Sequence, residues 1–421
     1  MTNSTPASPD VRMHGFSRRS EVPDVLEWID RSALRLPSES VSLEEAAGRI
    51  LAAALVSPLD VPGFDRAAMD GYALRGADTA GASEYNPLDF PVVGQSMPGQ
   101  PFAGTIPDRA AIRIMTGAPV PPDVDSVIPA EYVSEANGQI AITRSVAPGQ
   151  HVGHRGEDIG EGAAALSAGR RLRPQDVGLI ASLGLASVTV VRRPRVRLLV
   201  TGNEVRAPGT PKGPYEIYDA NSYTLRGLVD RDGGVLESHQ RLGDDPGVIR
   251  AALAAPGADV ILVSGGSSVG SEDHAPRLVA ELGELPIHGV AMRPSSPAGA
   301  GRIGETLVFL LPGNPVSCLC AYDFFAGRAL RLRGGRSGDW PHRRIRAKVA
   351  RKIVSAIGRV DYCRVRIVDG AVDPIALSGA SMLSSTTRAD GFVIVPAESE
   401  GYGPETEVAV YLYDEFPQQT P

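Results

Sequence analysis

Three apolar runs in the second half of the chain each end in a loop that contains glycine: "RVRLLVTGNE", "ADVILVSGGSS" and "TLVFLLPGNP". Stretches with helical spacing lie between them, in residues 221–233 and 244–257, and the second begins with Asp245 and Pro246 as cap and first turn. Continuous apolar strands that alternate with helices predict a parallel sheet with helices on both faces. Ligands of such sheets bind beyond the carboxyl ends of the strands, and all three loops are expected there.

The pattern of apolar and polar residues in the first half of the chain changes twice. Residues 21–36 have the apolar spacing of a helix, and residues 42–57 predict another, because Ser42 and Glu45 form a capping-box pattern. Short β-like runs separated by Gly and Pro follow, and helical spacing returns in residues 169–194. A helical region that is split by a β-rich insert predicts a discontinuous domain.

These changes predict a multidomain protein of the α/β plus β class. A chain of 421 residues exceeds the size at which one hydrophobic core usually stops growing. After residue 337 the runs "RRIRAKVARKI", "RVDYCRVRIV", "DGFVIVP" and "EVAVYLY" have strand character. The predicted parts are a discontinuous helical domain (15–57 and 150–193), a β-rich insert (58–149), an α/β domain (194–336) and a C-terminal β domain (337–417).

Charge and composition exclude several classes of function. The chain carries 42 Lys and Arg against 49 Asp and Glu, a net charge of −7, which argues against nucleic acid as a partner. No apolar run approaches membrane-spanning length and the N-terminus lacks a signal-peptide core, so we expect a cytoplasmic protein without a membrane partner. The cysteines, Cys318, Cys320 and Cys363, are too sparse for a disulfide framework and are expected to be buried, inert thiols.

The loop "VSGGSSVGSED" (263–273) has two interpretations. In the first, its glycines serve only a strand-to-helix turn with positive φ. Alternatively the loop is an anion-binding nest, in which bare backbone N–H groups and serine hydroxyls surround an anion and Asp273 holds the cation that accompanies it. The residues of such a nest are Ser264, Gly265, Gly266, Ser267, Ser268 and Gly270.

Other loops offer polar residues whose simplest roles are structural. Glu204 follows another strand, where a lone acid is commonly a cap, and Asp219 precedes a predicted helix for which Asn221 is an equally good cap. Asp70 and Thr116 fit simple turns in the insert. The stiff loop with Pro312, Gly313 and Pro315 suits close approach to a flat or bulky ligand, and the acids of "HRGEDIG", Asp158 among them, fit a surface ion pair.

Taken together, these loops resemble the MoeA/gephyrin E-domain family, the molybdopterin molybdenumtransferases. The resemblance extends from about residue 20 to 415 and is carried, in order, by "FDRAAMDGYA", "RIMTGAPVP", "RGEDI", "LVTGNEV", "YDANSY", "SGGSSVGSED", "HGVAMRP", "LPGNPVS" and "GRVDYCRVR". It implies a homodimer with a MoaB/MogA-like three-layer α/β domain and a C-terminal β-barrel-like domain. It also implies that the enzyme hydrolyses the pyrophosphate link of adenylylated molybdopterin, releases AMP and inserts molybdate at the dithiolene, with Mg²⁺ assisting.

The resemblance assigns roles to particular positions. Catalytic roles fall to Asp70, Thr116, Asp158, Glu204 and Asp273, and Mg²⁺ binding falls to Glu204 and Asp273. Asp70 and Thr116 would face the α/β loops across the dimer interface. Substrate binding falls to Asp219, Ser264, Gly265, Gly266, Ser268, Gly270, Arg293, Ser296, Pro312, Gly313, Pro315, Arg359 and Ser381. The partners implied are the molybdopterin adenylyltransferase and the molybdoenzymes that receive the cofactor.

One motif departs from the family pattern. Where the family commonly has K-P-G-K-P, this chain has "RPSSP" (293–297). Arg293 keeps the first positive charge and offers a planar fork to an oxyanion, whereas Ser296 loses the second charge where molybdate is expected. Arg359 and hydroxyls such as Ser378 or Ser381 are expected to compensate. The departure leaves two alternatives open, a molybdopterin carrier or scaffold and a paralogue that handles tungstate, although the retained acids favour an enzyme.

Overall fold

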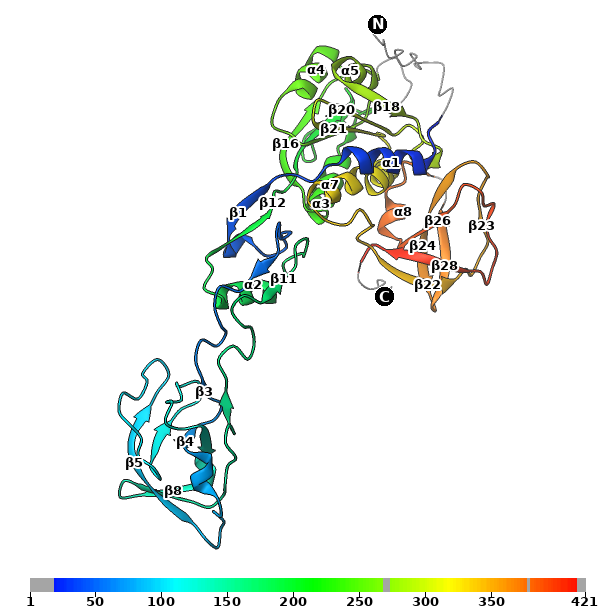
Figure 1. Cartoon of the computed structure of the whole chain (residues 1–421). Helices are drawn as coiled ribbons and strands as arrows, with labels where there is room; N and C mark the ends of the chain where they lie inside the picture. Colours follow the sequence, from blue (N-terminus) through cyan, green and yellow to red (C-terminus); the bar gives the residue numbers. More distant parts are fainter. Residues whose placement is uncertain (1–18, 268–272, 377–378, 415–421) are drawn as a thin grey trace. The chain divides into compact units, whose positions relative to one another are not determined.

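A computed structural model describes residues 19–267, 273–376 and 379–414 of the chain (Figure 1). Their contacts divide the chain into two compact units, Met1–Glu39 with Val191–Pro421, and Ser40–Val190. Each unit is described by itself. No helix in the described ranges is long and apolar enough to cross a membrane.

The first unit contains a six-stranded sheet in the order β16-β13-β17-β21-β20-β18. Its first four strands are parallel, as the continuous apolar runs predict. The last two extend the sheet by antiparallel pairing, which the sequence did not predict. The bounds are β13 Arg195–Thr201, β16 Val235–Leu242, β17 Val260–Ser264, β18 Glu284–His288, β20 Gly299–Ile303 and β21 Thr306–Leu311.

Helices cover both faces of this sheet and make three layers (Figure 1). Alternate side chains of β13 point to opposite faces, so that Leu198 packs with one helical layer and Leu199 with the other. The first layer holds α1 (Val22–Ser32), α3 (Asn221–Arg231), α6 (Pro315–Ala321), the π-helical turn η4 (Tyr322–Ala326) and α7 (Gly327–Arg333); the second holds α4 (Pro246–Ala254) and α5 (Ala275–Leu282). Asp245 accepts hydrogen bonds from the amides of Gly247 and Val248, which confirms the predicted cap.

A second sheet in this unit has the order β19-β24-β26-β28-β22, with β25 on β24, and confirms the predicted β-rich C-terminal region. Its edge strand β19 comes from the α/β half of the unit and pairs in parallel with β24, with Arg293 opposite Asp361. The remaining elements complete the unit: β14 Val205–Arg206, β15 Ile217–Tyr218, β19 Met292–Arg293, β22 Arg343–Lys348, β23 Ile353–Val354, β24 Val360–Val368, β25 Ala371–Ala376, α8 Ser384–Thr387, β26 Gly391–Val395, β27 Gly401–Tyr402 and β28 Glu407–Leu412.

The second unit contains a six-stranded sheet in the order β7-β4-β6-β5-β9-β8, with separate apolar clusters around Ile112 and Ile128. This sheet is the β-rich insert that the short runs predict. Its elements are β3 Arg66–Ala67, β4 Gly71–Leu74, η2 Gly76–Thr79, β5 Leu88–Ser96, β6 Ala111–Ile114, β7 Ser126–Pro129, η3 Ala130–Tyr132, β8 Val133–Ala136, β9 Gln139–Ile142 and β10 Val152–Gly153.

The helix predicted over residues 42–57 is wrong. Ser42 ends strand β1, one 3₁₀ turn follows, and the serine side chain makes no capping bond. Leu51 is buried and forms a bridge with Val190, so tertiary pairing with a distant segment overrides the local helical spacing. This part of the unit has one α-helix and paired short strands: β1 Ser38–Ser42, η1 Leu43–Glu45, β2 Leu55–Val56, β11 Ala164–Leu166, α2 Pro174–Ser182 and β12 Ser187–Val191.

Candidate functional site

The three glycine-containing loops follow strands that are neighbours in the first sheet. β17 lies between β13 and β21 and is parallel to both. The loops therefore meet at the carboxyl edge of the sheet, where the sequence predicts them and where open α/β sheets bind ligands. This edge is the candidate site of the first unit.

The turn at Gly265 and Gly266 is too tight for any side chain. Both residues have positive φ, +94° and +57°. An added Cβ would lie 2.5 Å from the carbonyl oxygen of Thr201 at Gly265, and 2.8 Å from the Thr201 hydroxyl at Gly266. The turn therefore presents bare backbone at the end of β17, as an anion-binding nest requires.

The amide of Gly265 does not belong to that nest. It donates to the carbonyl of Leu311 at 3.1 Å, so the inference that this N–H is uncovered is wrong. The bond continues the pairing of β17 with β21 by one residue and joins the loop after β17 to the last residue of β21. Ser267 is buried and its carbonyl lies 3.1 Å from Nε2 of His288. Ser268 and Gly270 lie outside the described residues.

Thr201 and Asp273 flank the bare turn. Oδ1 of Asp273 would lie 3.9 Å from a Cβ on Gly266, on a side chain that is half-buried. The Thr201 hydroxyl is buried and has no hydrogen-bond partner among the described residues. A hydroxyl and a carboxylate thus border the surface that a phosphate would approach. Thr201 is not among the site residues predicted from the sequence. The available signal was its position as the last residue of a strand before a glycine-containing loop.

Glu204 is exposed and folds back toward its own loop. Its Oε2 would lie 2.7 Å from a Cβ placed on Gly202, and its carbonyl accepts the amide of Ile217 at 3.0 Å. This bond joins the loop after β13 to the short ribbon of β14 and β15. Of the expected structural roles, a helix cap does not hold, because α3 begins only at Asn221, and a turn cap stays a prediction.

Asp219 is a buried anchor of α3. Its carboxylate accepts the amide of Ser222 at 3.0 Å and the Ser222 hydroxyl at 2.6 Å. His239 and Arg241 of β16 approach the same carboxylate to 3.5 Å and 3.8 Å. Burial lowers the pKa of His239, although the charge of Asp219 opposes this shift. Asp219 therefore joins the edge strand to the beginning of α3, and Asn221 does not make the local cap.

Asn221 instead joins two of the ligand loops. Its amide nitrogen donates to the Ser264 hydroxyl at 2.9 Å and to the Gly313 carbonyl at 2.8 Å. Ser264 is therefore engaged inside the protein rather than free for a ligand. The sulfur of Cys318 lies 3.7 Å from the same hydroxyl, and burial raises the pKa of its thiol to about 12. This agrees with the expected inert thiol.

Two arginines of the same unit share one buried carboxylate. Arg293 forms an ion pair with Asp361, and Nε of Arg359 lies 3.6 Å from the other oxygen of that carboxylate. Ser355 also donates its hydroxyl to Asp361 at 2.7 Å. Asp361 is fully buried, whereas both arginines are partly exposed. Two guanidinium groups and one carboxylate leave this cluster with one net positive charge. The structure thus brings together Arg293 and Arg359, the two cations that are expected to bind the oxyanion.

The first turn of α6, which follows the loop after β21, contacts the residues before Ser296 and Ser381. The hydroxyl of Ser295, next to Ser296, donates to the carbonyl of Ser317 at 2.6 Å. The amide of Val316 donates to the carbonyl of Ala380, next to Ser381, at 2.9 Å. The residues that precede Ser296 and Ser381 are thus bonded to α6, the helix that begins at Pro315. Ser378 lies outside the described residues.

The remaining predicted site residues lie in the second unit. Thr116 donates its amide and its hydroxyl to Oδ1 of Asp70 at 2.7 Å and 2.6 Å. These bonds lower the pKa of Asp70 and hold its exposed carboxylate ionised. Asp158 is also exposed, and Arg155 of the same loop pairs with Asp60 at 2.6 Å.

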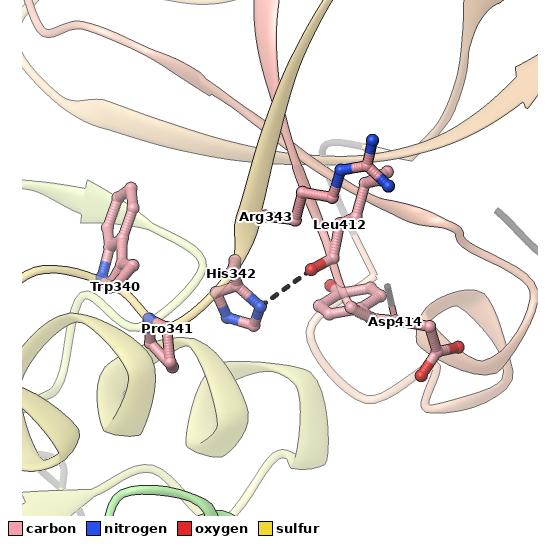
Figure 2. A pocket seen from close by; sticks show the side chains of 7 residues that line it. Trp340, Pro341, His342, Arg343, Leu412 and Asp414 are labelled. Atoms are coloured by element: carbon pink, nitrogen blue, oxygen red, sulfur yellow. Dashed lines mark hydrogen bonds between the residues drawn. The ribbon is translucent and has the colours of Figure 1, made fainter. Parts of the chain in front are cut away.

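A separate pocket lies by the C-terminal sheet and is lined by Trp340, Pro341, His342, Arg343, Leu412, Tyr413 and Asp414 (Figure 2). His342 donates from Nδ1 to the carbonyl of Leu412 at 3.0 Å, and its Nε2 lies 3.6 Å from buried Asp323. The imidazole therefore holds β22 and β28 to the helical layer. None of the predicted site residues lines this pocket.

Comparison with known proteins identifies the chain. It matches three family models: the MoeA N-terminal region (domain I and II) over residues 20–184, a probable molybdopterin binding domain over 197–331, and the MoeA C-terminal region (domain IV) over 346–413. It is 34% identical over 387 residues to molybdopterin molybdenumtransferase 2 of Mycobacterium tuberculosis, covering 88% of this chain and 94% of that protein. The chain belongs to the molybdopterin molybdenumtransferase family.

Other members agree with this assignment. The molybdopterin molybdenumtransferase of Haemophilus influenzae is 32% identical over 86% of this chain and 90% of its own length. A crystal structure of the molybdopterin biosynthesis MoeA protein from Pyrococcus horikoshii is 33% identical, with a TM-score of 0.83 over 95% of this chain and 100% of that one. The resemblance is thus confirmed: the chain is a transferase of molybdenum-cofactor biosynthesis, and the carrier alternative is not favoured.

No preassembled metal site occurs in the described part of this family member. Residues 19–267, 273–376 and 379–414 contain no group of three or more His, Cys, Asp and Glu side chains that fits a metal ion.

Proposed function

We propose that this protein inserts molybdate into adenylylated molybdopterin, with hydrolysis of the pyrophosphate bond and release of AMP. The observation that carries the proposal is the arrangement around α6. A bare-backbone turn bordered by Thr201 and Asp273 follows the strand next to β21. Ser295, two residues after Arg293 of the Arg293–Asp361–Arg359 cluster, is bonded to Ser317 of α6, the helix that follows β21. The same unit thus offers a surface for a phosphate and a cationic group for an oxyanion.

The phosphate half consists of the Gly266 turn and the acids next to it. A phosphoryl group is expected to lie against Gly266, where no side chain fits, and to accept hydrogen bonds from backbone amides beyond Gly265. Glu204 and Asp273 would hold Mg²⁺, which would neutralise pyrophosphate charge and polarise the phosphorus–oxygen bond. Asp158 or Asp219, the other acids that the resemblance assigns to the site, would orient the attacking water.

The oxyanion half consists of Arg293, Arg359 and Asp361. Molybdate carries two negative charges, and the cluster supplies one net positive charge in fixed geometry because Asp361 is buried between the guanidinium groups. This charge compensates in part for the lysine that Ser296 replaces. Ser296 and Ser381 are expected to donate hydroxyl hydrogen bonds to the same anion.

We further propose a cytoplasmic homodimer in which Asp70, Thr116 and Asp158 of a second copy complete the site. Asp70, held ionised by Thr116, suits a place opposite bound cations or polar substrate groups. A molybdopterin adenylyltransferase would supply the substrate and molybdoenzymes would accept the product, because an adenylylated pterin must be made upstream and a metallated cofactor must be used downstream.

The test is AMP release by the purified full-length protein, supplied with adenylylated molybdopterin and Mg²⁺, with and without molybdate. Release that depends on molybdate supports the proposal and indicates that Ser296 is tolerated. Release that depends instead on tungstate would assign the protein to another oxyanion. Tight pterin binding without AMP release under any of these conditions would overturn the proposed reaction.

A further inference from the structure

Asn221 bridges two loops that belong to different strands. It is the first residue of α3, its side chain is 8% exposed, and its one NH₂ group donates both to Ser264 and to Gly313. We propose that Asn221 is a positioning residue for substrate binding, which sets the spacing between the Gly265–Gly266 turn and the Pro312–Pro315 loop. The inference rests on the proposed function, because it assigns these loops to one substrate.

The surroundings of Asn221 fix where its amide points. Asp219 holds the next residue, Ser222, through both the backbone amide and the hydroxyl. Asp219 is itself buried against His239 and Arg241 of the edge strand β16. Asp219 and Ser222, on either side of Asn221, fix the beginning of α3. The two hydrogen bonds of Asn221 therefore hold Ser264 and Gly313 at a fixed separation.

The Asn221 bridge adds a side-chain link to the strand pairing that joins the two loops through Ser264 and Leu311. A Cβ on Gly313 would lie 3.6 Å from Cα of Gly265, so their backbones are nearly in contact. The Gly265 amide is bonded to Leu311, whereas the side-chain amide of Asn221 donates to both the Ser264 hydroxyl and the Gly313 carbonyl. Removing the NH₂ group would leave a part-buried carbonyl without its donor, and the loops would separate or admit water.

The decisive variant is Asn221→Asp, which keeps the shape and replaces the NH₂ group by an oxygen that faces the Gly313 carbonyl. We expect the KM for adenylylated molybdopterin in AMP release to rise about tenfold or more, with kcat changed by no more than about twofold, because the bridge serves ground state and transition state alike. Ser264→Ala removes one of the two bonds and is expected to raise KM by a smaller factor.

A matched control is Asn86→Asp in the second unit. Asn86 also donates its side-chain amide to a backbone carbonyl, that of Gly81 at 3.0 Å, and this bond joins no ligand loops. This variant is expected to keep the wild-type KM. If Asn221→Asp does not fold, Asn221→Ala and Ser264→Ala are compared by KM, kcat and thermal unfolding midpoint.

The outcomes distinguish a failure of the proposed role of Asn221 from a failure of the proposed function. A lower unfolding midpoint with an unchanged KM would mean that Asn221 only stabilises the fold, and would overturn the inference. A fall in kcat at constant KM would overturn it as well and would place Asn221 in the chemical step. A wild-type protein that releases no AMP would refute the proposed function instead, whatever the variants do.

Discussion

Arg293 and Asp361 form an ion pair across the two β-strands that join the α/β half of the first unit to its C-terminal sheet. They are register partners in the parallel pair of β19 and β24, and Asp361 is fully buried. The pair therefore has two functions in this protein. It holds the edge strand in place and it orients a guanidinium group beside the proposed oxyanion site.

Replacing Arg293 by alanine should weaken both functions. The buried carboxylate would keep Arg359 and Ser355 but lose its closest cation, and we expect the free energy of unfolding to fall by about 2 kcal/mol. Molybdate affinity should fall in the same variant, as measured by titration calorimetry. Arg366→Ala is the control on the same strand, since Arg366 and its partner Asp373 are more exposed and such pairs contribute little, about 0–1 kcal/mol. Equal losses in both variants would contradict a special role for Arg293.

Replacing Asp273 or Glu204 by alanine should abolish AMP release and leave the fold intact. Asp273 is half-buried and Glu204 is exposed, so neither substitution leaves a large cavity, whereas each removes a carboxylate proposed to hold Mg²⁺. The measurements are AMP release and the far-ultraviolet circular dichroism spectrum. Glu281→Ala on α5 is a matched control, because Glu281 pairs with Arg277 on the helix surface. Normal turnover in either site variant would remove that residue from the mechanism.

Replacing Ser296 by lysine should tighten molybdate binding. The change restores a positive charge beside a cluster that carries only one net charge, and an ion pair near the protein surface gains about 1 kcal/mol or a few times that, roughly fivefold or more in affinity. Titration with molybdate, and with tungstate for comparison, measures the effect. Ser182→Lys on the exposed surface of α2 adds the same charge elsewhere. Unchanged affinity in Ser296→Lys would mean that the anion binds at another place.

The stability of the second unit should depend on pH through Asp176. Hydrogen bonds from Arg173, then from Arg170, lower the pKa of this carboxyl well below its ordinary value of 3.8. Because the folded-state pKa is the lower one, the stabilisation is present above about pH 4 and is lost as the pH falls further. Asp176→Asn should lower the unfolding temperature at neutral pH, and the difference from wild type should shrink below pH 4. A difference that stays constant with pH would exclude this ionic contribution.

The sequence predicted the α/β elements well because their signals are local. Residues 260–264 are buried on both faces of the sheet, as a continuous apolar run predicts. The amides that Asp245 caps, those of Gly247 and Val248, lie two and three residues further along the chain. The failure over residues 42–57 has the opposite cause. The spacing of Ala46, Ile50 and Leu51 suits one face of a helix, but these residues are buried against a segment more than 100 residues away in sequence.

At the site, the sequence determined which residue types are available and the structure determined what each of them contacts. Gly265 was correctly placed in a ligand loop, but its amide is bonded to Leu311. Asp219 and Asn221 were equally good caps in the sequence; in the structure Asp219 holds the helix and Asn221 bridges the loops. The position of Thr201 at the end of a strand before a glycine loop was a sequence signal, but only the fold shows that its hydroxyl is buried without a partner among the described residues.

The sequence by itself therefore determined the family, the parallel sheet and the edge at which its glycine loops lie. Those properties follow from local patterns: the period of burial, the positive φ that glycine allows and the order of the motifs along the chain. The tertiary structure alone decided which charges meet. Arg293 reaches Asp361 across 68 residues because β19 pairs with β24 in one register, and long-range pairing depends on how the whole core packs rather than on the residues beside each partner.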